Sequence, residues 1–130
     1  MSDNSQTKDF AAGSRHIVVI EDNFDSAEVL QTFLEIHGHQ VTVRYTAEEG
    51  LTAVKQFLPD IVICDISLSD ATDGYDIARK IKQSEALSSI FLIALSGYGR
   101  AEDKEKSKDA GFDEHLTKPT DFDYLLKLIG

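Results

Sequence analysis

Each of four short apolar stretches of the sequence is followed by side chains that can take part in chemistry. In chain order, these side chains are Glu21 with Asp22, Asp65, Ser96 and Lys118. If the stretches are parallel β-strands, their carboxyl ends meet at one edge of a sheet, which is where the reactive sites of such folds lie. Three carboxylates, a hydroxyl and an ammonium group would then converge on a single edge.

Three carboxylates at one edge repel one another, and removing water from any of them is costly, so protons or a cation must compensate. Mg²⁺ prefers oxygen ligands and is usually held by a few carboxylates together with phosphate oxygens. We therefore predict that Glu21, Asp22 and Asp65 hold a magnesium ion. Taken alone, the Glu21-Asp22 pair is typical of a helix N-terminus, and its placement beside Asp65 favours the metal site.

Asp65 is the candidate nucleophile. An aspartate carboxylate can attack phosphorus, and a bound metal ion screens its charge from that of the incoming phosphate. Lys118 would neutralise a non-bridging phosphate oxygen, and the Ser96 hydroxyl would donate a hydrogen bond to another. The predicted chemistry is phosphorylation of the protein on Asp65.

The elements that position these groups follow from hydrophobic periodicity. Short apolar runs alternate with longer segments of helical period, which is typical of a parallel sheet covered by helices on both faces. The predicted strands contain residues 17–20, 41–45, 61–64, 90–95 and 114–117. We predict an α/β protein, a flavodoxin-like (βα)5 three-layer sandwich whose parallel strands have the order 2-1-3-4-5.

Five segments of helical character follow these strands. The second opens with a capping box at 46–49 and closes at Pro59, with Leu51, Val54 and Leu58 on its predicted inner face. The other predicted helices are marked by Ala27, Leu30 and Leu34, by Ile77 and Ile81, by the charged segment 100–110, and by Leu125 and Leu128.

The length of 130 residues and the 42% apolar content predict one domain. We expect residues 1–14 to be a flexible leader, because they are polar and show no period, and residues 15–130 to form the folded domain. His37 and His39 flank a predicted helix stop and are expected to be polar surface rather than metal ligands.

The net charge of −10 disfavours direct binding to nucleic acid or to an anionic membrane surface. No segment is apolar for long enough to be inserted in a membrane, and the start does not resemble a signal peptide. Cys64, the single cysteine, lies in an apolar run and is expected to be buried. These observations favour a cytoplasmic location.

From about His16 to its end, the chain resembles the receiver domains of two-component response regulators. The matching pieces are IVVIEDN, IVICDISL, IALSGYG and HLTKPTD. Each piece alone is a weak signal, but all four in order at matching strand ends are highly specific. The resemblance implies that a histidine kinase or a histidine phosphotransfer protein donates a phosphoryl group to Asp65 in the presence of Mg²⁺.

The same resemblance implies that an unknown output protein reads the phosphorylated surface. The chain would then not be an enzyme in the usual sense, because it would catalyse only its own aspartyl phosphorylation and dephosphorylation. The family also uses the backbone carbonyl two residues after the acceptor as a metal ligand, which is that of Ser67 here. The peptide bond between Lys118 and Pro119 is expected to be cis.

Other implied roles fall on residues where this sequence departs from the family. His115 stands where receivers have a Tyr or Phe that works as a switch together with Ser96. Tyr98 stands at a position that tunes the access of water to the phosphoryl group. Because family donors approach the start of the first helix, the donor is expected to dock near Phe24 and Ala27.

Two alternative functions remain. A phosphatase of the haloacid-dehalogenase type also uses a strand-end aspartate, but its Asp-x-Asp signature is missing, because Ile66 and Ser67 follow Asp65. A receiver-like interaction module that is never phosphorylated would usually have lost Asp65, an acid of the pair or Lys118. The sequence leaves open whether the chain is a stand-alone receiver or part of a larger protein such as a hybrid kinase.

Overall fold

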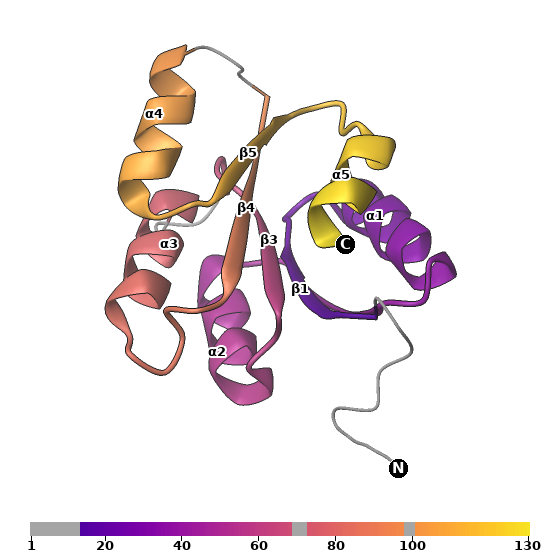
Figure 1. Ribbon diagram of the computed structural model, residues 1–130, viewed down its shortest axis with the longest axis horizontal. Coiled ribbons are helices and arrows are strands. Elements are labelled where there is room, and N and C mark those ends of the chain that lie inside the picture. Colours follow the sequence, from indigo (N-terminus) through magenta and orange to yellow (C-terminus); the bar gives the residue numbers. More distant parts are fainter. Residues whose placement is uncertain (1–13, 69–72, 98–100) are drawn as a thin grey trace.

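The computed structural model describes residues 14–68, 73–97 and 101–130, in which strands and helices alternate (Figure 1). The strands are β1 His16–Ile20, β2 Gln40–Arg44, β3 Ile61–Asp65, β4 Phe91–Ser96 and β5 Glu114–Thr117. The helices are α1 Phe24–Ile36, α2 Ala47–Phe57, α3 Gly74–Gln83, α4 Ala101–Ala110 and α5 Phe122–Ile129.

All strand pairs are parallel, and their order is β2-β1-β3-β4-β5. Figure 1 shows α1 and α5 on one face of the sheet and α2, α3 and α4 on the other. The predicted α/β class, the three layers and the strand order are therefore confirmed.

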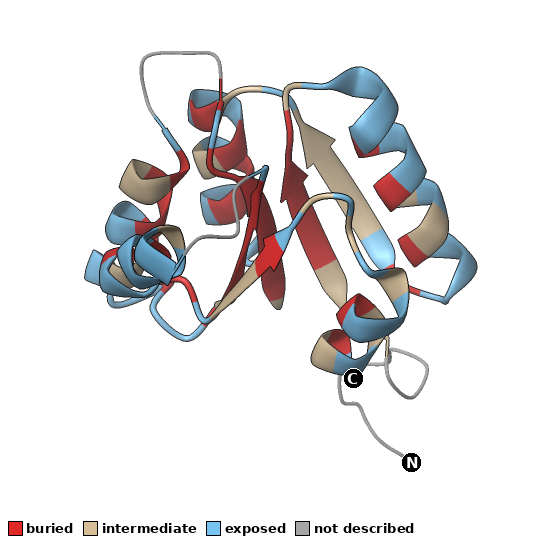
Figure 2. Cartoon of the chain, turned by 90° about the horizontal axis from the view of Figure 1, so that it is seen from above, coloured by how far each residue is buried: buried red, intermediate tan, exposed pale blue. Residues whose placement is uncertain are grey.

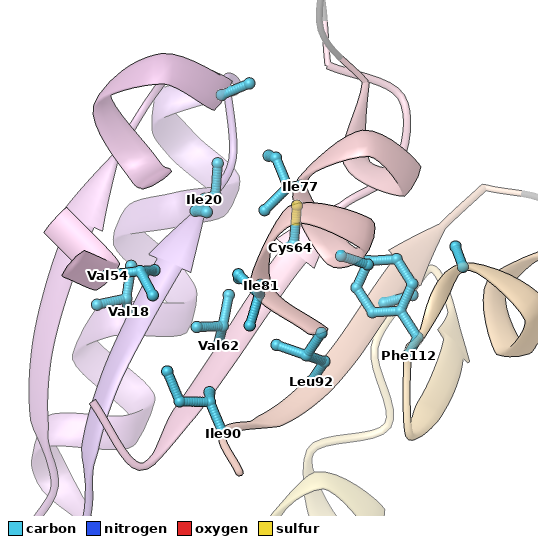
Figure 3. Close-up of a cluster of buried hydrophobic side chains, with 14 of the residues drawn as sticks. Val18, Ile20, Val54, Val62, Cys64, Ile77, Ile81, Ile90, Leu92 and Phe112 are labelled. Carbon is cyan, nitrogen blue, oxygen red and sulfur yellow. The ribbon is translucent and has the colours of Figure 1, made fainter. Parts of the chain in front are cut away.

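The interior strands are apolar along their whole length because helices cover both of their faces. Every residue of β3 is buried, and Figure 2 shows buried positions filling the central strands. Successive side chains point to opposite faces, so Val62 and Cys64 enter one core while Ile61 and Ile63 enter the other. Figure 3 shows Cys64 beside Ile77 of α3 in the first core, which confirms that the cysteine is buried.

Side-chain caps begin several helices just beyond the carboxyl ends of the strands. The capping residues are Asn23, Thr46, Asp73 and Asp121, and each accepts a hydrogen bond from the backbone N–H three residues later. Gly38, just after α1, has φ +90°, which is the left-handed conformation that ends a helix. The helix starts therefore surround the edge of the sheet that carries the predicted site.

The predicted inner face of α2 is wrong at Leu58. The helix ends one residue earlier, and Leu58 is a left-handed C-cap with φ 47° whose side chain is 60% exposed. Ala47, Gly50 and Ala53 join Val54 in the buried face instead. The left-handed cap turns the Leu58 side chain away from the helix face that the periodicity had assigned to it.

The predicted leader lies outside the described residues, except for Ser14. The hydroxyl of Ser14 donates a hydrogen bond to the carbonyl of Gly38 at 2.8 Å, so this residue contacts the folded domain. Within the described ranges, no helix combines the length and the apolar character that crossing a bilayer requires.

Candidate functional site

The predicted site residues gather at the carboxyl edge of the sheet. Asp65 ends β3, Ser96 ends β4, and Glu21 and Lys118 directly follow β1 and β5. Glu21, Asp65 and Ser96 are all buried, although they are polar. Register explains the convergence, because β1 and β3 pair side by side and Ser96 pairs with Thr117, the residue before Lys118.

Lys118 joins the two buried carboxylates. Its Nζ donates hydrogen bonds to Asp65 Oδ2 at 2.8 Å and to Glu21 Oε1 at 2.9 Å. The other oxygens of these carboxylates accept backbone hydrogen bonds, Asp65 Oδ1 from the Ser67 N–H at 2.8 Å and Glu21 Oε2 from the Asn23 N–H at 3.1 Å. All four carboxylate oxygens therefore have a donor, and these donors hold both side chains in place.

The charges at this edge are not balanced by Lys118 alone. Burial raises the pKa of the Glu21 carboxyl above its ordinary value, against the opposing hydrogen bond from Lys118. For Lys118, partial burial is the largest influence and lowers the pKa, but the hydrogen bonds to Asp65 and Glu21 raise the pKa above its ordinary value overall. One well-held ammonium group thus faces more carboxylate charge than it can neutralise.

The residues present fit a divalent metal ion. Glu21, Asp22 and Asp65 each offer a carboxylate oxygen, and these atoms lie within 4.8 Å of one another. We call these three residues the acid trio. Asp22 is less buried than the other two and lies toward the surface. An all-oxygen donor set with excess negative charge suits Mg²⁺.

The structure also describes the surroundings of three more predicted site residues, Ser96, Pro119 and Ser67. The Ser96 carbonyl accepts a hydrogen bond from the Lys118 N–H at 2.7 Å. The peptide bond between Lys118 and Pro119 is cis, as the family resemblance implied. Ser67 is exposed and directs its N–H to Asp65, while Tyr98 lies outside the described residues.

His115 contacts a residue that the sequence reasoning missed. It pairs with Ala94 of β4 across the sheet, and its Nδ1 lies 2.7 Å from the hydroxyl oxygen of Ser107 in α4. Ser107 is 1% exposed. The only sequence signal for this contact is an uncharged residue in the middle of a charged helix.

The two residues that mark the predicted docking surface at the start of α1 differ in their exposure. Phe24 is 67% exposed and packs edge to face against Tyr45, with 4.4 Å between the ring centroids. Ala27 is 1% exposed because it faces the sheet, so its side chain offers no surface to a partner. A pocket of about 330 Å³ lies next to the site, with Val29 and Phe122 on its apolar walls.

Gly74 is a second residue that the sequence reasoning did not assign to the site. Its N–H donates a hydrogen bond to the carbonyl of Ile66 at 3.1 Å, at the start of α3. A Cβ at this position would lie 2.7 Å from the carbonyl oxygen of Asp65. The absence of a side chain therefore lets α3 begin directly against the backbone of Asp65.

Comparison with known families agrees with this geometry. Residues 17–130 match the profile of the response regulator receiver domain. The chain belongs to this family. The chain is 31% identical to Protein PilH of Pseudomonas aeruginosa over 113 residues. The aligned region is 87% of this chain and 93% of PilH.

Solved receivers share the fold. A response regulator receiver domain protein from Clostridium thermocellum is 28% identical and superposes with a TM-score of 0.80, covering 88% of this chain and 90% of that one. The DNA-binding dual master transcriptional regulator RpaA of Synechocystis is 27% identical, and the matched region is 85% of this chain but 45% of RpaA. This chain therefore spans less than half of that longer relative.

Proposed function

We propose that this receiver accepts a phosphoryl group on Asp65 from a phosphohistidine donor, with Mg²⁺ bound, and signals by altered protein binding. The observation that carries the proposal is the joint hydrogen bonding of Lys118 to Asp65 and Glu21 beside Asp22. This arrangement holds a carboxylate nucleophile, the ammonium group of Lys118 and excess negative charge together at the carboxyl edge of the sheet.

The nucleophile is held in place before the donor arrives. A carboxylate oxygen of Asp65 attacks phosphorus, the new P–O bond forms as the P–N bond of phosphohistidine breaks, and the imidazole leaves with the bonding electron pair. Each oxygen of Asp65 accepts one hydrogen bond in the resting site, so a lone pair remains for the attack on phosphorus. Lys118 lies close enough to Asp65 to donate a hydrogen bond to a phosphoryl oxygen of the new aspartyl phosphate.

The acid trio and the backbone carbonyl of Ser67 would hold the metal ion. When bound, Mg²⁺ supplies positive charge that lets a dianionic phosphoryl group enter a site lined by carboxylates. Lys118 and the Ser96 hydroxyl would each stabilise one phosphoryl oxygen. Tyr98 would limit the access of water to the phosphoryl group.

We infer that the donor is a histidine kinase or a histidine phosphotransfer protein that contacts Phe24. Phe24 is exposed at the start of α1, and the pocket next to the site is lined by Val29, Phe122 and Lys118. An apolar partner helix seated there would bring its phosphohistidine to the same edge as Asp65. A Phe24→Ala variant is expected to slow transfer from the protein donor but not uptake from a small phosphodonor.

Intact-mass measurement after incubation with Mg²⁺ and acetyl phosphate tests the central claim. The receiver should gain the mass of one phosphoryl group, and Asp65→Asn should gain none. Asp109→Asn is the matched control, because Asp109 is exposed on α4. Absence of any gain would leave the unphosphorylated interaction module, and sustained release of phosphate from a free phosphomonoester would favour the phosphatase.

A further inference from the structure

One side of β2 is open to solvent. Among the residues that the structure describes, β2 pairs with β1 alone and lies at the end of the strand order. On the β1 side, the Gln40 N–H donates a hydrogen bond to the Arg15 carbonyl at 2.9 Å. Because backbone groups alternate in direction along a strand, those of Val41 and Val43 point away from β1. β2 therefore presents N–H and C=O groups to any strand that pairs along its free side.

The side chain of Arg44 covers part of this free side. Its Nη1 donates a hydrogen bond to the carbonyl of Val43 at 2.8 Å, which agrees with an outward direction of that carbonyl. Charged side chains on edge strands are a common protection against unwanted strand pairing. Arg44 satisfies one backbone group, whereas a paired strand would satisfy several. The cover is therefore one that a suitable strand can displace.

A groove of about 510 Å³ lies beside the free side of β2, between this strand and α2. Its lining includes Arg44, Tyr45, Glu48 and Glu49. The two glutamates are exposed in the first turn of α2, and within the described ranges neither side chain is in an ion pair. The guanidinium of Arg44 bonds to the backbone instead. The lining therefore has excess negative charge, as the whole chain does.

The groove lies where alternate side chains of an added strand would point. Val41 and Val43 pack in the core on the α1 side of the sheet. Since side chains alternate along a strand, Thr42 and Arg44 project to the α2 side, and so would the residues opposite them in a paired strand. When an extended peptide adds to a sheet edge, main-chain hydrogen bonds supply affinity and pockets for alternate side chains supply specificity.

We propose that the free side of β2 binds an extended segment of a partner protein in which every second residue is lysine or arginine. The segment would bond to the backbone of Val41 and Val43, displace the Arg44 side chain, and place its basic side chains beside Glu48 and Glu49. A second copy of this chain fits less well, because it would bring its own acidic groove and a net charge of −10 to the same place. This binding does not depend on the proposed phosphorylation.

A designed probe peptide tests the proposal. The probe is a dye-labelled heptapeptide with blocked ends and the sequence Thr-Lys-Val-Lys-Val-Lys-Thr, and its binding is followed by fluorescence anisotropy. One control peptide has glutamate in place of lysine, and another has proline in place of valine. The lysine probe should bind roughly tenfold more tightly than either control, because one lacks the charge and the other lacks the N–H donors. Equal binding of the lysine and proline peptides would refute strand addition.

Variants of the protein locate the probe on β2. Val43→Pro removes an outward N–H at an edge position that tolerates proline, and it should weaken binding by roughly tenfold. Glu48→Gln combined with Glu49→Gln should also weaken binding by roughly tenfold, because the charge of the groove is lost. Glu85→Gln combined with Glu105→Gln is the charge-matched control, since both residues are exposed and neither lines the groove. Equal weakening by the two pairs would contradict this site.

Arg44→Ala should have the opposite effect. Because the variant uncovers the Val43 carbonyl, it should bind the lysine probe roughly threefold more tightly than the parent does. Lys55→Ala, at an exposed position of α2, removes the same charge without uncovering the edge and is the control. Binding by Arg44→Ala no tighter than that by Lys55→Ala would rule out the cover. Self-association of Arg44→Ala in sedimentation without peptide would show that the edge accepts a second copy instead.

Hydrogen exchange followed by NMR reports on the same backbone groups. The amides of Val41 and Val43 should exchange rapidly in the free protein and become roughly tenfold slower with the probe bound. The amide of Thr42, which points to β1, should be protected in both states. Protection of Val41 and Val43 in the free protein would show that the chain itself covers the edge, and the proposal would then be wrong.

Discussion

The two ends of the sheet use the same kinds of side chain for different purposes. At the amino end, Asp113 Oδ2 accepts the backbone N–H of Leu92 at 2.8 Å, and His39 Nδ1 accepts that of Arg15 at 3.0 Å. At the carboxyl end, Lys118 bonds to both buried carboxylates, and Asp22 adds a third carboxylate within 4.8 Å of them. Polar groups that satisfy the backbone stabilise the fold, whereas polar groups that face one another with excess charge are prepared to bind something else.

The largest difference between the two ends is expected from removal of a lysine. Lys118→Ala should slow phosphoryl uptake from acetyl phosphate by about 100-fold or more, because one preorganised donor for the transition-state charge is lost. Lys82→Ala at the amino end removes a lysine bonded to Asp113 and to the Ile90 carbonyl. Lys82→Ala should therefore leave the rate of phosphoryl uptake unchanged. Intact-mass measurements over time follow this rate for both variants.

Removal of an aspartate at the amino end should affect stability instead. Asp113→Ala leaves the buried Leu92 N–H without its acceptor, so the free energy of unfolding should fall by about 1 to 3 kcal/mol in urea titrations. Asp109→Ala, at an exposed position of α4, should change the free energy of unfolding by no more than about 0.5 kcal/mol. Equal losses in the two variants would contradict the structural role of Asp113.

Neutralising a carboxylate at the carboxyl end should mainly affect the response to metal. Glu21→Gln keeps the size of the side chain but removes one carboxylate charge of the acid trio, and its single amide oxygen can accept only one of the two hydrogen bonds that Glu21 accepts. The additional stability that Mg²⁺ confers in urea titrations should decrease, because one ligand of the ion is weakened. An unchanged stabilisation by Mg²⁺ would contradict the role of Glu21 as a ligand.

The smallest effect concerns pH and His39. Burial lowers the pKa of His39, and the charges of Arg15 and His37 act in the same direction, so the fold favours the neutral ring. The resulting stability is present above the unfolded-state pKa of about 6.5 and is lost as the pH falls through the lower pKa of the folded state. The free energy of unfolding should therefore fall between about pH 7 and pH 5.

His39→Asn checks this pH dependence, because an asparagine oxygen can accept the Arg15 N–H without titrating. The decrease in unfolding free energy on acidification should be shallower in this variant. Part of the decrease should remain, since burial also lowers the pKa of His16. His37→Asn, at an exposed position, is the control and should retain most of the decrease, because the charge of His37 is the smallest of the three influences that lower the pKa of His39.

Much of the fold could be predicted because its signals are local. The run at 61–64 predicted β3 because both faces of an interior strand must be apolar, and Thr46 predicted the start of α2 because a cap acts within one turn. Leu58 was misjudged for the opposite reason. Its exposure depends on how the end of α2 turns, which the periodicity of the helix does not encode.

By itself, the sequence determined the alternation of strands and helices and the placement of Glu21, Asp65 and Lys118 at strand ends. Hydrophobic period and capping depend on neighbours a few residues away, so both are present in the linear chain. Only the tertiary structure decided that Lys118 bonds Glu21, 97 residues distant, and that Ser107 reaches His115. These contacts depend on strand register and helix packing, which arise only when the whole sheet is assembled.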